Sequence, residues 1–273
     1  MSRKWIAVSL FLIYFLTTSP AASPDRRDSS LPQPQPGIEG CKELPAHAAL
    51  KKALAAAQAE QNGGLGFHMW GTVVDRDGVV CDVAFTGAGR GDQWPGSRVI
   101  SAQKANTANA FSLPKFALST ANLFSAVQPG QSLFGLQESN PVDHGVAYGG
   151  PPAQYGAPTD PMKGKRIGGV NVFGGGLGLY TAAGRLVGGL GVSGDTSCAD
   201  HIIAWKTRHT LNLDNVPAGV AGAGKDNIIH DVTVDPATGH TTSKGGFGHP
   251  TCSAESTKIA NALPTSHPPG PGQ

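Results

Sequence analysis

The stretch GGVNVFGGGLGLYTAAGRLVGGLGVSGD, residues 168–195, decides the fold. Two apolar runs, Leu177 to Tyr180 and Leu186 to Ser193, flank a short segment around Ala183-Gly184. Apolar runs joined by a short glycine-containing turn are typical of a β-hairpin. The abundance of glycine, 38 of 273 residues, indicates tight turns and close backbone approaches.

A helix is expected directly after this hairpin, because Asp195 or Thr196 can cap it. One stripe of this helix carries Cys198, Ile202, Trp205 and His209.

A second hairpin is predicted upstream, from Phe67 to Val74 and from Val79 to Phe85, with Asp77-Gly78 in its turn. Further strands are predicted at Ile167–Phe173 and at Asn227–Val234. Strands paired by tight turns favour an antiparallel sheet.

Three more helices are expected to cover this sheet. They span Leu44–Glu60, a region from Ser97 to Phe111 with small or apolar residues at every third position, and Pro114 to about Val127. A long Gly- and Pro-rich loop runs from Gly135 to Arg166. The fold class predicted from these elements is α+β, a layered domain rather than an alternating parallel one.

The N-terminus has the order of a secretory signal: Arg3 and Lys4, then an apolar run from Trp5 to Leu16, then small residues. We therefore expect a signal peptide at 1–22, followed by a Pro-rich linker at 23–40. The formal net charge of +2 comes from Arg3 and Lys4, so the exported chain would be near neutral. Nothing in this balance favours a nucleic-acid partner.

Four cysteines in an exported chain predict two disulfides, with three possible pairings. We favour Cys81 with Cys198 inside the domain, which leaves Cys41 with Cys252 to tie the two ends. Because no C-x-x-C pair exists, zinc is the weaker interpretation.

Several ordered blocks resemble one family. In RVISAQKANTANAFSLP (98–114), Ser101, Lys104, Ala105, Thr107 and Ala108 match a Ser-x-x-Lys-Ala-x-Thr-Ala helix. QPGQSLFGLQESNPV (128–142) and the Gly-Val-Ser-Gly turn at 191–194 follow in the same order. Together these blocks resemble the GlcG/HbpS-type haem-binding proteins.

This resemblance covers about Leu44 to Leu213 and implies a layered α-β-α domain with a five-stranded antiparallel sheet. It also implies a homo-oligomer that binds haem or a related tetrapyrrole. We expect the family-like domain at 41–213 and a Gly/Pro-rich C-terminal extension at 214–273.

A haem site needs an axial iron ligand, apolar walls and cations for the propionates. His201 and His144 are the candidate iron ligands, and Trp205 offers a flat surface on the same helix face as His201. The other candidate cofactor-binding residues are Arg98 and Lys104 as cations, Thr107 on the same helix, and Gly191 and Ser193 of the glycine turn. That turn, Gly189 to Gly194, also spells a dinucleotide fingerprint, but we interpret it as a tight strand-to-helix turn whose amides could hold a propionate.

The sequence therefore predicts a periplasmic or secreted haem-binding protein acting in haem transport, buffering or sensing. Two alternatives stay open. One is an oxidoreductase of thiol or flavin type that uses Cys198 or the glycine turn. The other is a non-catalytic module that presents its loop and tail to a membrane sensor or transporter.

Overall fold

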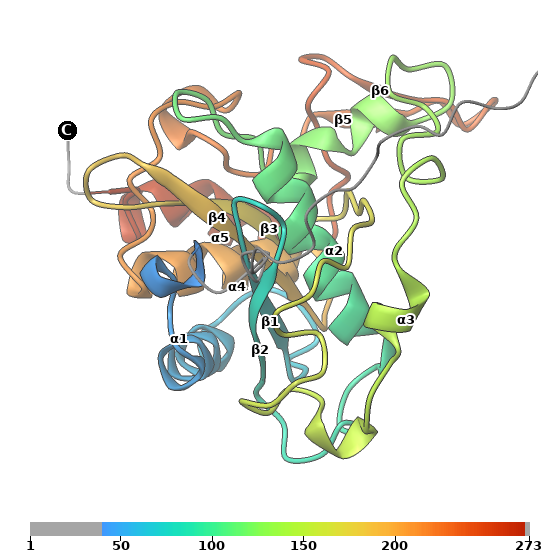
Figure 1. Ribbon diagram of the computed structural model, residues 1–273. Coiled ribbons are helices and arrows are strands. Elements are labelled where there is room, and N and C mark those ends of the chain that lie inside the picture. Colours follow the sequence, from blue (N-terminus) through green and yellow to red (C-terminus); the bar gives the residue numbers. More distant parts are fainter. Residues whose placement is uncertain (1–39, 271–273) are drawn as a thin grey trace, which may run out of the picture. The chain divides into compact units, whose positions relative to one another are not determined.

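Two hairpins form the main antiparallel sheet (Figure 1). In order across the sheet, the strands are β2 (Val80–Phe85), β1 (Trp70–Asp75), β4 (Leu186–Ser193) and β3 (Gly176–Tyr180). The central pair, β1 and β4, is in register with Trp70 opposite Ser193 and Thr72 opposite Gly191. Both predicted hairpins are thus confirmed, and they lie side by side in a single sheet.

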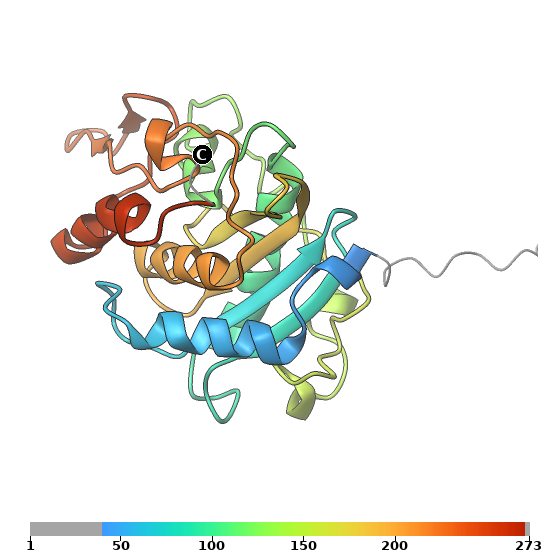
Figure 2. The ribbon, with the colours of Figure 1, turned by 90° about the vertical axis from the view of Figure 1, so that its left-hand side faces the viewer.

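Helices cover both faces of the sheet (Figure 2). One face carries α1 (His47–Ala59) and α4 (Ser197–Thr210), and the other carries α2 (Gly96–Phe111). A further helix, α5 (Ala254–Ser266), packs on α4. The α-β-α layering expected from the resemblance is therefore present.

Short elements make up the loops. They are η1 (Gly40–Glu43), η2 (Thr120–Leu123), η3 (Ser125–Val127), α3 (His144–Ala147), η4 (Pro152–Gln154), η5 (Gly222–Gly224), and the hairpin of β5 (Val232–Val234) and β6 (Thr241–Ser243). The computed structural model describes residues 40–270, so the predicted signal peptide (1–22) and residues 23–39 of the predicted linker lie outside the described residues. Within residues 40–270, no helix has the length and apolarity needed to cross a bilayer.

The helix α2 approaches the sheet at two glycines of β4. A β-carbon on Gly191 would overlap the carbonyl oxygen of Ser101, and one on Gly189 would overlap that of Ala105. Backbone therefore meets backbone along this face, and Ala102, Ala105 and Ala108 are completely buried. Gly189 to Ser193 belong to β4, so most of the predicted turn is strand, and its glycines serve helix packing.

Four strands, not five, form the main sheet, so the five-stranded expectation is wrong. The predicted strand at Ile167–Phe173 is irregular, because Gly168 and Gly169 adopt φ values of +65° and +79° that interrupt an extended ladder. The predicted strand at Asn227–Val234 shrinks to β5, which pairs with β6 in a separate hairpin.

The predicted helix from Pro114 to Val127 is also wrong. The chain turns back between Leu113 and Phe116, and Ala117 then bridges to Gly219. Only two 3₁₀ turns follow, the first with a capping box between Ser119 and Asn122. The helix α5 was missed, although Ser253 caps it.

The disulfide pairing differs from the predicted one. Cys41 pairs with Cys81 and Cys198 pairs with Cys252. All four cysteines are therefore in disulfides, but each bridge joins neighbours in sequence order. The reason is local: η1 runs beside β1 and β2, while α5 starts at the N-terminus of α4.

We expect Gly191→Ala to destabilise the fold, because the new methyl group must push α2 away from β4. Overpacking of this kind costs about 1–3 kcal/mol or more of unfolding free energy. Gly96→Ala is the matched control, since Gly96 has open space around it at the start of α2. Urea denaturation of both variants measures the difference, and equal midpoints would contradict the packing role of Gly191.

Candidate functional site

A surface cleft opens where the start of α1, the loop after β2 and the loop around η4 meet. Its cavity volume is about 350 Å³, within the range of small-molecule sites. Side chains that matter for its chemistry are His47, Lys51, Phe85, Arg90, Pro152 and Tyr155. We call this the α1 cleft.

An apolar hollow of about 220 Å³ adjoins the α1 cleft and shares Arg90, Pro152 and Tyr155 with it. Its floor contains Trp70, which stacks on Phe85 with ring centroids 4.2 Å apart. The cleft and the hollow together give an extended surface of aromatic walls with a cation, Arg90, at the point they share.

His47 is held by a buried carboxylate. Its Nδ1 lies 2.7 Å from Oδ1 of Asp82, and the Asp82 side chain is only 4% exposed. An ionised carboxylate can only accept, so Nδ1 carries the proton and Nε2 of the neutral ring carries the lone pair. Lys163 Nζ, 2.9 Å from the second oxygen of Asp82, supports the ionised form. A carboxylate behind an imidazole is the arrangement that orients histidine ligands at metal sites.

The wall formed by the η4 loop is fastened to α2 by a buried ion pair. Arg98 Nε donates to Asp160 at 2.9 Å, a second nitrogen of the same guanidinium also donates to Asp160, and a third donates to Ala147 O. Asp160 in turn accepts from the backbone N–H of Gly156. The guanidinium lies 3.7 Å from the ring centroid of Tyr155 and so positions a residue that lines both cavities.

Arg98, predicted as a propionate cation, thus borders the apolar hollow but is already paired. Lys104 is also paired within the protein. Its Nζ lies 2.7 Å from Asp200 and 3.1 Å from the carbonyl oxygen of Val192, and the side chain is buried. Burial lowers the pKa of Lys104 and raises the pKa of Asp200 to about 6, and their mutual attraction opposes both shifts.

His201 is completely buried on α4. Its Nε2 accepts from the backbone N–H of Ile228 and contacts Asn227 Oδ1, each at 3.1 Å, while its Nδ1 has no hydrogen-bond partner among the described residues. Burial lowers the pKa of His201 to about 3, so the ring is neutral. Trp205 packs nearby, with its Nε1 donating to the carbonyl of His267.

The remaining predicted residues are dispersed. Thr107 is buried and accepts from the backbone of Asn171, whereas Gly191 and Ser193 lie in β4 under α2 and beside β1. His144 is exposed at the start of α3. The structure therefore does not gather the predicted residues around one cavity.

Sequence reasoning missed His47, Lys51, Asp82 and Tyr155. One signal was available: His47 and Lys51 are four residues apart, so they share one helix face. Asp82 lies 35 residues away on β2, and no spacing rule connects it to His47.

We expect Arg98→Met to lower the unfolding free energy by about 3–5 kcal/mol, because it leaves the buried Asp160 carboxylate without its partner. Glu43→Gln is the control, since the Glu43–Arg185 pair is exposed and should contribute nothing measurable. Chemical denaturation measures both. A similar small loss for both variants would show that the Arg98–Asp160 pair does not hold the η4 loop.

The pKa of His201 predicts a dependence of stability on pH. An unfolded histidine binds a proton below about pH 6.5, whereas His201 in the folded chain does so only near 3, so the unfolded state gains protons first. Stability should therefore fall as pH drops from 6.5 towards 3, by up to about 1.4 kcal/mol per pH unit from this group. Asp200 acts in the opposite direction because its pKa is raised. Denaturation at several pH values should show a shallower fall for His201→Gln than for the wild type, and an unchanged slope would contradict the assignment.

Comparison with known proteins assigns the chain to a family. The family profile described as "Haem degrading protein HbpS-like" matches residues 45–208, which include α1, all four strands of the main sheet and most of α4. No curated protein matches the chain.

Two solved structures are similar to the chain. A PduOC–haem complex is 23% identical, with 61% of this chain and 93% of that chain covered and a TM-score of 0.42. The Klebsiella pneumoniae protein ORFY, of the DUF336 family, is 26% identical, with 61% and 89% covered and a TM-score of 0.41. Likenesses at this level add no argument to the family match. Because that match spans more than half of the 273 residues, the chain belongs to the HbpS-like family.

Proposed function

We propose that this protein binds haem in the α1 cleft, where Nε2 of His47 would hold the iron. The observation that carries the proposal is the bond from His47 Nδ1 to the buried Asp82 carboxylate, which leaves Nε2 as the lone-pair nitrogen of a ring that lines the cleft. Proximal histidine is a common way of holding haem iron, and an oriented ring is a better ligand than a free one.

The surroundings of His47 fit the rest of a haem group. Phe85 and Tyr155 supply flat apolar walls, and Lys51 and Arg90 are exposed cations suited to two propionates. The adjoining hollow, with Trp70 in its floor, extends the apolar surface. When bound, haem would supply an iron centre for redox or ligand chemistry, and the chain would hold and orient it.

The proposal includes export and assembly. We propose a periplasmic or secreted protein that acts in haem transport, buffering or sensing as a homo-oligomer, with a membrane sensor or transporter as partner. Two disulfides support an oxidising compartment.

The thiol-oxidoreductase alternative is less well supported. It requires a free thiolate at Cys198, but Cys198 and Cys252 form a disulfide and none of the four cysteines is free. A flavin-type oxidoreductase would need the glycine turn to bind its cofactor, but Gly191 of that turn lies against α2. This alternative is therefore also less well supported.

Titration of the purified chain with haemin tests the proposal. We expect a Soret shift that saturates near one haem per chain. His47→Ala should weaken binding at least about tenfold, since loss even of an outer-sphere partner of a metal ligand costs about 10–100-fold. The measurement is the absorption spectrum at increasing haemin concentration.

His144→Ala and His201→Gln serve as controls, because these histidines are the ligands that the sequence favoured. If only His144→Ala or His201→Gln lost haem binding, the iron ligand would not lie in the α1 cleft. The absence of any Soret shift at micromolar haemin in the wild type would remove the haem proposal altogether.

A further inference from the structure

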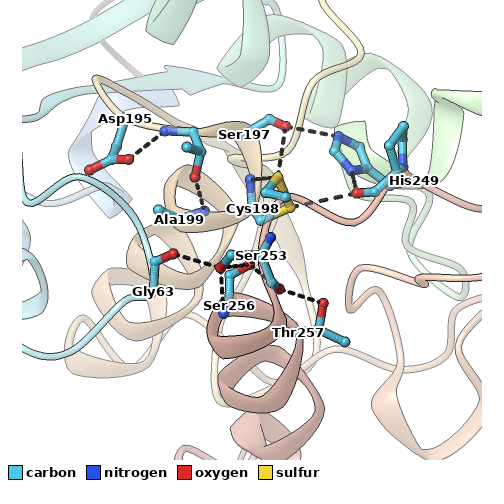
Figure 3. Close-up of a disulfide and its surroundings, with 12 residues drawn as sticks. Gly63, Asp195, Ser197, Cys198, Ala199, His249, Ser253, Ser256 and Thr257 are labelled. Carbon is cyan, nitrogen blue, oxygen red and sulfur yellow. Dashed lines mark hydrogen bonds between the residues drawn. A yellow bond between two sulfur atoms is a disulfide. The ribbon is translucent and has the colours of Figure 1, made fainter.

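The disulfide between Cys198 and Cys252 lies where two helices begin (Figure 3). Thr196 caps α4, with Cys198 in its first turn, and Ser253, directly after Cys252, caps α5. The hydroxyl of Ser253 also donates to the carbonyl of Gly63 in the loop after α1. The N-termini of both helices therefore face the sulfur atoms, and helix N-termini stabilise negative charge.

A histidine completes this cluster. The ligand atoms of Cys198, His249 and Cys252 all lie within 4.8 Å of one another. Nδ1 of His249 lies 2.8 Å from the carbonyl of Pro250, so Nδ1 carries the proton and Nε2 carries the lone pair. That nitrogen accepts from the hydroxyl of Ser197 at 3.1 Å (Figure 3).

We propose that reduction of the Cys198–Cys252 disulfide converts this cluster into a Zn²⁺ site with two thiolates and His249 Nε2 as ligands. Two thiolates and one imidazole form a set that zinc accepts, with water in the fourth position. Tetrahedral ligand atoms at ~2.0–2.3 Å from zinc lie roughly 3.3–3.8 Å apart, so the two sulfur atoms must separate once their bond is reduced. Small side-chain movements suffice, because all three ligand atoms already lie within 4.8 Å of one another. The Ser197 hydroxyl gives up its bond to Nε2 when the metal binds.

The reductant is a dithiol, for example that of a disulfide oxidoreductase. Its first thiolate attacks Sγ of Cys252, which is exposed, while Cys198 is buried and leaves as a thiolate at the start of α4. The second thiol of the reductant then attacks the mixed disulfide and releases Cys252. Two electrons pass from the dithiol, which becomes a disulfide, to the protein sulfurs, and zinc displaces any protons that they take up.

The disulfide between Cys41 and Cys81 provides an internal comparison. The third group beside it is Asp75, and the Asp75 carboxylate already accepts from the backbone N–H groups of Asp77 and Val79. Among residues 40–270, no histidine belongs to that cluster. It therefore lacks the lone-pair nitrogen that His249 supplies.

The test uses the full-length, haem-free chain, reduced with a dithiol and then freed of the reductant. Co²⁺ added to this sample should give the visible d–d bands of tetrahedral cobalt together with thiolate charge-transfer absorption, saturating at one ion per chain. Zn²⁺ should abolish these bands, and the untreated oxidised chain should give none. Absence of the bands from the reduced chain overturns the proposal.

Variants distinguish this site from other thiols. Cys41→Ser/Cys81→Ser should keep the bands, whereas Cys198→Ser/Cys252→Ser should lose them. His249→Gln should weaken cobalt binding by more than about a hundredfold, the upper end of what loss of an outer-sphere partner costs. Circular dichroism shows whether each variant is folded. Bands that persist unchanged in folded His249→Gln or in Cys198→Ser/Cys252→Ser also overturn the proposal.

Discussion

The fold depends on the contact between α2 and β4, where helix backbone lies directly on strand backbone. Gly189 and Gly191 permit this contact, because any side chain there would collide with the carbonyl groups of α2. The close approach brings Lys104 within reach of Asp200 on α4 and sets the position of Arg98. The Lys104–Asp200 and Arg98–Asp160 pairs, and through Arg98 the wall of the α1 cleft, therefore depend on the absence of side chains at Gly189 and Gly191.

Local patterns in the sequence were sufficient for the two hairpins, for α2 and for α4. Each of these elements has a strong local signal, such as Asp77-Gly78 in a turn or Thr196 as a cap. Segments governed by tertiary contacts could not be predicted in the same way. The chain from Pro114 to Val127 is apolar enough for a helix, but it is held open by its bridge to Gly219, a hundred residues away.

The residues predicted to bind haem are not gathered around one cavity, for a related reason. Residues of the resemblance motif, such as Lys104 and Thr107, are buried in hydrogen bonds that stabilise the layers. The cleft is instead lined by residues from the start of α1 and from the η4 loop, which carry no recognisable motif. Its most informative contact, between His47 and Asp82, joins a helix to a strand and becomes visible only in three dimensions. The motif residues Lys104 and Thr107 therefore belong to the packing of the layers, and the cleft had to be found from the structure.

The attachment of the η4 loop to α2 has a consequence for recognition. The guanidinium of Arg98 packs on the Tyr155 ring, and Asp160 accepts hydrogen bonds from backbone N–H groups of its own loop, so contacts within the protein fix this wall. A guest entering the cleft then loses little affinity to the ordering of protein segments. Binding would be rigid docking against a preformed wall. The shape and charge of the cleft, rather than closure of a loop, would then set its selectivity.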